Sequence, residues 1–203
     1  MNSIMNDTEK IELISINVLK TSLNSIDNDS FIKELDSSET TIEKKYLEDK
    51  NQSYYEDRKY PFGKPEAEKL ITEITNAVNA AVGIEVVMSE IWTVTLEKGQ
   101  SIIAHTHKIS SPVNQEKYYS VAYYPTAPEN SAELVFFVNA CNTIEKQIII
   151  KPKTGDLIIF NSYLMHMTKR HNNPDQRRIV VSANFHPKDP KIMQMSDFSG
   201  YKP

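Results

Sequence analysis

From residue 84 to residue 184 the chain is a succession of short segments in which hydrophobic residues alternate with polar ones or run continuously. Eight segments are rich in Ile, Val, Tyr and Phe, and turn-forming stretches separate most of them. Short strands at this spacing, with no helix between them, predict a sandwich or jelly roll rather than a parallel sheet. The predicted strands are 84–88, 90–96, 101–107, 118–124, 133–138, 147–151, 156–160 and 178–184.

A helical pattern precedes these strands. From Pro65 to Val82 apolar residues recur at three- and four-residue steps, Glu66 and Glu68 stand near the start, and Gly83 follows the end. The pattern predicts an amphipathic helix whose apolar face packs on the sheet.

The first sixty residues give weaker signals. Residues 11–19 alternate and predict a strand, and the polar run 28–30 predicts the cap of a short helix that ends near Leu35. The polar stretch 37–60 predicts a loop or a weakly held helix, anchored to the body by Tyr54, Tyr55 and Tyr60. We therefore expect a single domain with a strand and helical support region at 1–83, a core at 84–187 and a tail at 188–203.

The composition bears on the binding partners and the cellular location of the protein but does not indicate a specific function. A chain of 203 residues can bury a substantial core, and its single cysteine excludes an intramolecular disulfide. A net charge of -4 gives no reason to expect nucleic-acid or membrane binding. The amino terminus lacks the pattern of a secretory signal, and no apolar run is long enough to span a bilayer, so we expect a soluble, cytoplasmic protein.

Candidate chemistry begins at the end of the segment 101–107, where two histidines stand one residue apart. Side chains alternate along a strand, so His105 and His107 would project from the same face, one pleat apart. Two neutral imidazoles held in this way form half of a metal site. Alone, the pair is equally compatible with a polar strand face.

Later motifs decide between these readings. Gly155 opens an apolar strand that leads to His166, and Arg178 opens the last strand. With Trp92 and the run 120–124, this order resembles the iron(II)/2-oxoglutarate-dependent dioxygenase superfamily over residues 90–187. It is closest to the prolyl-hydroxylase-like branch and related uncharacterised oxygenases of bacteria and phages, which also leaves a phage origin open. The resemblance implies a mainly β, α+β fold: a double-stranded β-helix with helices packed on one face.

The resemblance also implies a site. His105, His107 and His166 would hold Fe(II), and Arg178 and Tyr124 would bind the distal carboxylate of 2-oxoglutarate. Ser182 would supply a hydroxyl beside the arginine. Dioxygen would be the oxidant, and decarboxylation of 2-oxoglutarate to succinate would be coupled to hydroxylation of a small-molecule or peptidyl substrate. Residues 108–118 and 125–131 would flank the mouth of the site and select the substrate.

Two departures from the family pattern keep alternatives open. His107 stands where most of the superfamily carries Asp or Glu, and Val180 stands where many members carry a hydroxyl. Zinc and nickel also accept three imidazoles. A cupin-like metalloenzyme that does not use 2-oxoglutarate is the nearest rival, although the glutamate of a cupin motif is missing, and a ligand-binding barrel without turnover is the third possibility.

The remaining basic residues near these motifs are predicted to have no part in the site. Arg177 is expected at the surface, His171 in a solvent-facing loop, and His186 at the surface beyond the last strand.

Overall fold

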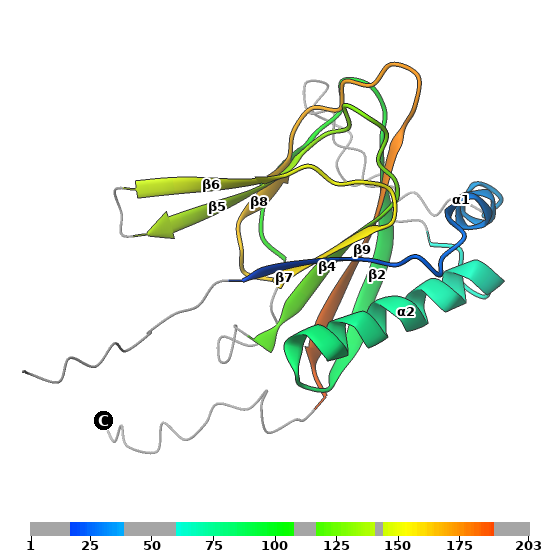
Figure 1. The fold of residues 1–203 in the computed structure, drawn as a ribbon, viewed down its shortest axis with the longest axis horizontal. Coiled ribbons are helices and arrows are strands. Elements are labelled where there is room, and N and C mark those ends of the chain that lie inside the picture. The colour runs from blue at the N-terminus through cyan, green and yellow to red at the C-terminus, as the bar shows by residue number, and fades with distance from the viewer. Residues whose placement is uncertain (1–16, 39–59, 108–116, 141–143, 189–203) are drawn as a thin grey trace, which may run out of the picture.

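The computed structural model describes residues 17–38, 60–107, 117–140 and 144–188, and these ranges form two antiparallel sheets with two helices (Figure 1). The five-stranded sheet has the order β1-β7-β4-β9-β2, and the four-stranded sheet has the order β3-β8-β5-β6. The elements are β1 (Val18–Ser22), α1 (Asn28–Asp36), α2 (Pro65–Val82), β2 (Val86–Leu96), β3 (Ile102–His105), β4 (Tyr119–Thr126), β5 (Leu134–Ala140), β6 (Ile144–Ile150), β7 (Asp156–Asn161), β8 (His166–Thr168) and β9 (Arg178–Pro187). The mostly antiparallel β architecture with few helices is as predicted.

Both helices cover the outer face of the five-stranded sheet, as Figure 1 shows. Leu70, Ile74 and Val78 of α2 are fully buried and share one core with the sheet residues Val121 and Val181. The predicted helix limits are confirmed, and Gly83 ends α2 in the left-handed conformation at φ 69°. Neither helix, within the described ranges, is long and apolar enough to cross a membrane.

The two helices also satisfy each other's exposed backbone groups. The first turn of α2 has no capping side chain of its own, because Lys64 occupies the N-cap. The carboxylate of Glu34 in α1 instead accepts hydrogen bonds from the backbone amides of Glu66 and Ala67, at 3.0 and 2.9 Å. Free amides at a helix start favour an anionic acceptor, so this contact fixes α1 against α2.

The N-terminal predictions are confirmed in part. The cap of α1 is Asp27 rather than a residue within 28–30, because its side chain accepts the backbone amide of Ser30 at 3.1 Å. Tyr60 is buried and donates to the carbonyl of Ala67 at 2.8 Å, which makes it an anchor as predicted. The predicted anchors Tyr54 and Tyr55 lie outside the described residues, as do most of 11–19 and 37–60.

Several strand limits differ from the predicted ones. The predicted strands 84–88 and 90–96 are one strand, β2, with a register shift between Met88 and Glu90. The strand β8 was not predicted, because three residues are too few to show an alternating pattern. The last strand continues to Pro187, so His186 is part of β9 and half-buried rather than a surface residue beyond it.

The alternation along β9 separates two cores. Ile179, Val181, Ala183 and Phe185 pack in the core beneath the helices, whereas Val180 packs with Val94, Tyr124 and Phe160 between the two sheets. Arg178, Val180, Ser182 and Asn184 share the inner side of the strand. The polar residues of β9 therefore face the interior between the sheets.

We expect Ile74→Ala to lower the free energy of unfolding by about 2–5 kcal/mol, because a fully buried side chain leaves a cavity between α2 and the sheet. Asn76→Ala, on the exposed side of the same helix, is the matched control and should change it by less than about 0.5 kcal/mol. Chemical denaturation of both variants measures the difference. Equal losses would contradict the packing of α2 described here.

Candidate metal centre and adjoining cationic pocket

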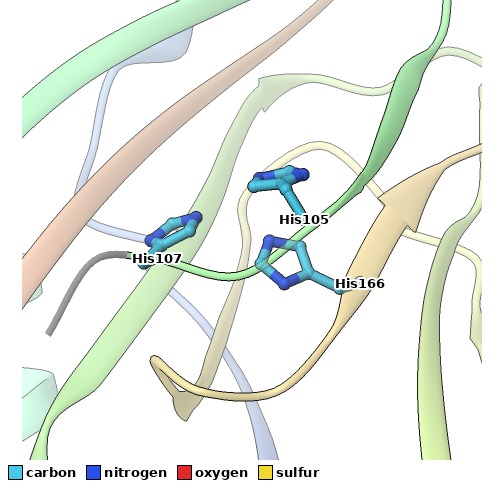
Figure 2. A group of neighbouring side chains, drawn as sticks. All are labelled: His105, His107 and His166. Atoms are coloured by element: carbon cyan, nitrogen blue, oxygen red, sulfur yellow. The ribbon is translucent and has the colours of Figure 1, made fainter.

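Three histidines meet between the two sheets. His105 ends β3, His107 follows two residues later, and His166 begins β8, which pairs with β3 so that His105 lies opposite His166. Each ring offers one ligand atom, and these atoms all lie within 4.8 Å of one another. Figure 2 shows the three rings grouped around one point. Because β3 stops at His105, His107 reaches this point from the segment after the strand, not as a strand residue as predicted.

Hydrogen bonds determine which nitrogen of each ring is free. The Nδ1 atom of His105 lies 2.8 Å from the carbonyl of Ile103, and that of His166 lies 2.8 Å from the carbonyl of Leu164. The Nδ1 atom of His107 lies 2.6 Å from Oδ1 of Asn184. All three partners are acceptors, so each Nδ1 carries the proton. Each Nε2 then keeps its lone pair, which is the arrangement found in histidines that bind metals.

The surroundings keep two of the rings neutral. Burial lowers the pKa of His107 to about 4, although the hydrogen bond with Asn184 opposes this shift. Burial, followed by the nearby charges of His105 and His107, lowers the pKa of His166 to about 3. Neutral imidazoles at physiological pH are the form that binds a metal cation.

A cationic pocket adjoins the histidines. Arg178 is 1% exposed, and its Nε and Nη1 atoms have no hydrogen-bond partner among the described residues. Tyr124 is fully buried, its hydroxyl also has no partner there, and the guanidinium carbon of Arg178 lies 4.8 Å from the centre of its ring. Burial lowers the pKa of Arg178 and raises that of Tyr124. These donors suit a buried carboxylate.

One cavity connects the two groups. The three histidines, Arg178, Tyr124 and Ser182, which the sequence predicts as site residues, all line it. Its wall also includes residues that sequence reasoning did not assign to the site, of which Thr168 is buried and polar. Because Thr168 belongs to the unpredicted strand β8, no sequence signal could place it. The other such residues are Val94, Ile102, Val121, Ala122, Leu134 and Phe160.

The arginine next to Arg178 lies elsewhere. Arg177 is partly exposed at the surface and pairs with Asp36 of α1 at 2.6 Å. The alternation of β9 thus sends the two neighbouring arginines to opposite sides, and the prediction that Arg177 is a surface residue is confirmed.

The prediction for His171 is wrong. His171 is fully buried, and its Nε2 lies 2.7 Å from the carbonyl of Gln176. Its backbone bonds to the turn after β2: Gly99 donates to the carbonyl of His171 at 2.7 Å, and His171 donates to Gln100 at 2.8 Å. A polar sequence context suggested a surface loop, but this histidine fastens that loop to the body.

The predicted substrate-selecting segments are described only in part. Residues 108–116 lie outside the described residues. Residues 125–131 lie at the end of β4 where Thr126 pairs with Ile179, next to Arg178, whereas Ser120 at the other end pairs with Asn184. That segment therefore follows the cationic end of the cavity.

Comparison with known proteins finds a family that is similar to the part of the chain that carries these features. The family described as "Putative 2OG-Fe(II) oxygenase" matches residues 90–184, a range that includes all three histidines and Arg178. The match supports the predicted resemblance to this superfamily. A search of curated proteins finds no match.

Several solved structures share the fold. HygX from Streptomyces hygroscopicus, solved with nickel and 2-oxoglutarate, is similar at a TM-score of 0.61 and 13% identity, over 85% of this chain and 84% of that one. SnoK, a non-heme alpha ketoglutarate dependent carbocyclase from nogalamycin biosynthesis, has a TM-score of 0.51 and 12% identity, over 62% and 60%. EvdMO1 has a TM-score of 0.50 and 20% identity, over 61% and 33%. The chain thus spans less than two thirds of SnoK and about a third of EvdMO1.

The lowered histidine pKa values predict acid sensitivity of the metal-free protein. Unfolding returns each histidine to a pKa near 6.5, so below that pH the unfolded chain binds protons that the folded chain does not. Stability should therefore fall as the pH drops from about 6.5 toward 4, by at most about 1.4 kcal/mol per pH unit for each histidine. Denaturation across this range should show a shallower dependence in His166→Gln. An identical slope in that variant would contradict the assignment.

Proposed function

We propose that the protein is an Fe(II)- and 2-oxoglutarate-dependent dioxygenase that hydroxylates a small-molecule or peptidyl substrate. The observation that supports this most is one cavity that joins three convergent histidine nitrogens to a buried arginine, which has no carboxylate partner among the described residues. A metal site alone would need no arginine, and a structural arginine would be paired. A cosubstrate with both a chelating group and a distal carboxylate accounts for both features.

Different residues of the cavity would bind the metal and the cosubstrate. His105, His107 and His166 would hold the metal through Nε2, and Arg178 with Tyr124 would fix the distal carboxylate of 2-oxoglutarate. When bound, the metal and cosubstrate supply the oxidation of a substrate C–H bond by dioxygen, with loss of carbon dioxide and formation of succinate. The protein supplies orientation and exclusion of water, since the buried apolar residues Phe160 and Val180 line the same cavity.

Three neutral ligands influence which metal binds. With His107 in place of a carboxylate, the ligand set carries no charge, so the full positive charge of a divalent ion remains in the cavity. HygX, which shares the fold, has been solved with iron and with nickel. Fe(II) is the proposed ion, and zinc or nickel would fit the same ligands without supporting the reaction.

The proposed reaction, hydroxylation, is more specific than the chemistry that the matched family indicates. A family of 2OG-Fe(II) oxygenases is matched, but the fold neighbour SnoK is a carbocyclase, so hydroxylation is our proposal for this chain. The two facing sheets, with both helices on the outer side of one, support the double-stranded β-helix as the architecture. We further propose that the protein works without a membrane or nucleic acid, in the cytoplasm.

Anaerobic titration with Fe(II) and 2-oxoglutarate tests metal and cosubstrate together, without knowledge of the substrate. We expect a weak visible charge-transfer band that is lost in His166→Ala. Arg178→Ala should weaken 2-oxoglutarate binding about 10- to 100-fold, because the cosubstrate carboxylate loses its charged partner, at a cost of about 1–3 kcal/mol.

Arg177→Ala is the matched control, since it removes a neighbouring arginine that pairs with Asp36 outside the cavity. It should leave 2-oxoglutarate affinity unchanged. If Arg178→Ala also leaves it unchanged while metal-dependent activity persists, the cupin-like alternative is favoured. A wild type that binds no metal and forms no succinate would indicate a binding-only barrel.

Substitutions at His107 test the unusual ligand. His107→Asp restores the carboxylate common in the superfamily and should retain Fe(II), whereas His107→Ala removes a donor and should weaken metal binding at least tenfold. Metal analysis of the purified variants, beside a succinate assay, measures both. Unchanged metal content in His107→Ala would show that His107 only lines the cavity.

A further inference from the structure

The three histidines are held in different ways. His105 and His166 direct Nδ1 to backbone carbonyls two residues earlier in their own segments. These contacts depend on local backbone geometry. His107 lies beyond the end of β3, and its Nδ1 instead contacts the side chain of Asn184, 77 residues away in sequence. Its orientation therefore depends on how that amide is turned.

The orientation of the Asn184 amide is itself fixed. Its Nδ2 lies 3.1 Å from a carboxylate oxygen of Glu90, which can only accept a hydrogen bond at neutral pH. The amide nitrogen must therefore face Glu90, and Oδ1 must face His107. Ser120 Oγ lies 2.8 Å from both Asn184 Oδ1 and Ser162 Oγ. Because Oδ1 is only an acceptor, Ser120 donates its hydroxyl proton to Oδ1 and accepts a hydrogen bond from the hydroxyl of Ser162.

We propose that Asn184, oriented by Glu90 and Ser120, is a positioning residue that holds His107 with Nε2 free and directed at the metal. The inference rests on the proposed function, because it assigns Asn184 a role toward the metal. Register supports it: Glu90 pairs with Asn184 across β2 and β9, and Ser120 pairs with Asn184 across β4 and β9. Three adjacent strands thus place the chain of hydrogen bonds.

Without this acceptor, His107 has no described partner that selects between its two neutral tautomers. The tautomer with the proton on Nε2 cannot bind the metal through that atom. Residues that hold a metal-binding histidine through its other nitrogen typically change metal affinity 10- to 100-fold when replaced. Asn184→Leu, similar in size but without an acceptor, should therefore weaken binding of Ni(II), used alone as the probe, about 10- to 100-fold.

A second variant exchanges the two partners. Asn184→Asp combined with Glu90→Gln keeps the same hydrogen bonds, because the Gln amide donates to the new carboxylate, which accepts from His107. This double variant should restore Ni(II) affinity to within about threefold of the wild type. Ser89→Ala is the matched control: it removes a hydrogen bond to the backbone carbonyl of Asn184 and leaves its side chain in place, so affinity should not change.

Long-range proton–nitrogen NMR of the metal-free protein gives a readout independent of activity. It should show His107 protonated at Nδ1 in the wild type and the double variant, and no longer held in that form in Asn184→Leu. Wild-type Ni(II) affinity in Asn184→Leu would overturn the inference and leave the proposed function standing. A wild type that binds no metal would instead refute the proposed function, and the NMR result alone would then decide whether Asn184 fixes the ring.

Folding of the variants is checked by circular dichroism. If Asn184→Leu does not fold, Glu90→Ala takes its place, because Glu90 is exposed and its removal only frees the Asn184 amide to turn. That variant should bind Ni(II) several-fold more weakly than the wild type. Unaltered binding and an unaltered His107 tautomer in Glu90→Ala would overturn the role assigned to Glu90 and Asn184.

Discussion

Along β9, successive side chains point to opposite sides of the five-stranded sheet, and both sides of that strand are covered. Ile179, Val181, Ala183 and Phe185 complete the core beneath the helices, so the register of β9 is fixed by apolar burial. A shift by one residue would place these side chains in the cavity and bury Arg178 and Asn184 beneath α2. The hydrophobic side of the strand therefore determines the position of its polar side. The site thus depends on the packing of the core beneath the helices, on the opposite face of the sheet.

The histidines of the site are stabilised in the interior by hydrogen bonds. A buried imidazole or guanidinium is costly unless its hydrogen bonds are satisfied. The histidines meet that requirement at Nδ1 and leave Nε2 available, so each ring is half satisfied by the protein and half committed to a ligand. Burial then keeps His107 and His166 uncharged. The same arrangement that limits the cost of burial thus prepares the rings to bind a cation.

Patterns that span many residues were read correctly from the sequence, whereas short or nonlocal features were not. The helix at 65–82 and most strands could be predicted from the regular spacing of their hydrophobic residues. The alternation of side chains along a strand distinguished Arg178 from Arg177. In contrast, β8 is too short to show a period, and the burial of His171 follows from pairing with a distant turn at Gly99. The contact of Asn184 with His107 joins residues 77 apart. Its partners could be placed on a strand face from sequence, but not recognised as partners.

The buried polar atoms of Arg178 and Tyr124 also affect how stable the protein is with and without a bound ligand. The Nε and Nη1 atoms of Arg178 and the hydroxyl of Tyr124 are buried without a hydrogen-bond partner among the described residues, which is a cost that the folded chain bears and the unfolded chain does not. A dianion that binds them selectively in the folded state raises stability by RT ln(1 + [L]/Kd). Under the proposed function, that dianion is a central metabolite of the cell. Resistance to proteolysis would then rise and fall with its concentration, so that nutritional state would influence how long each copy survives.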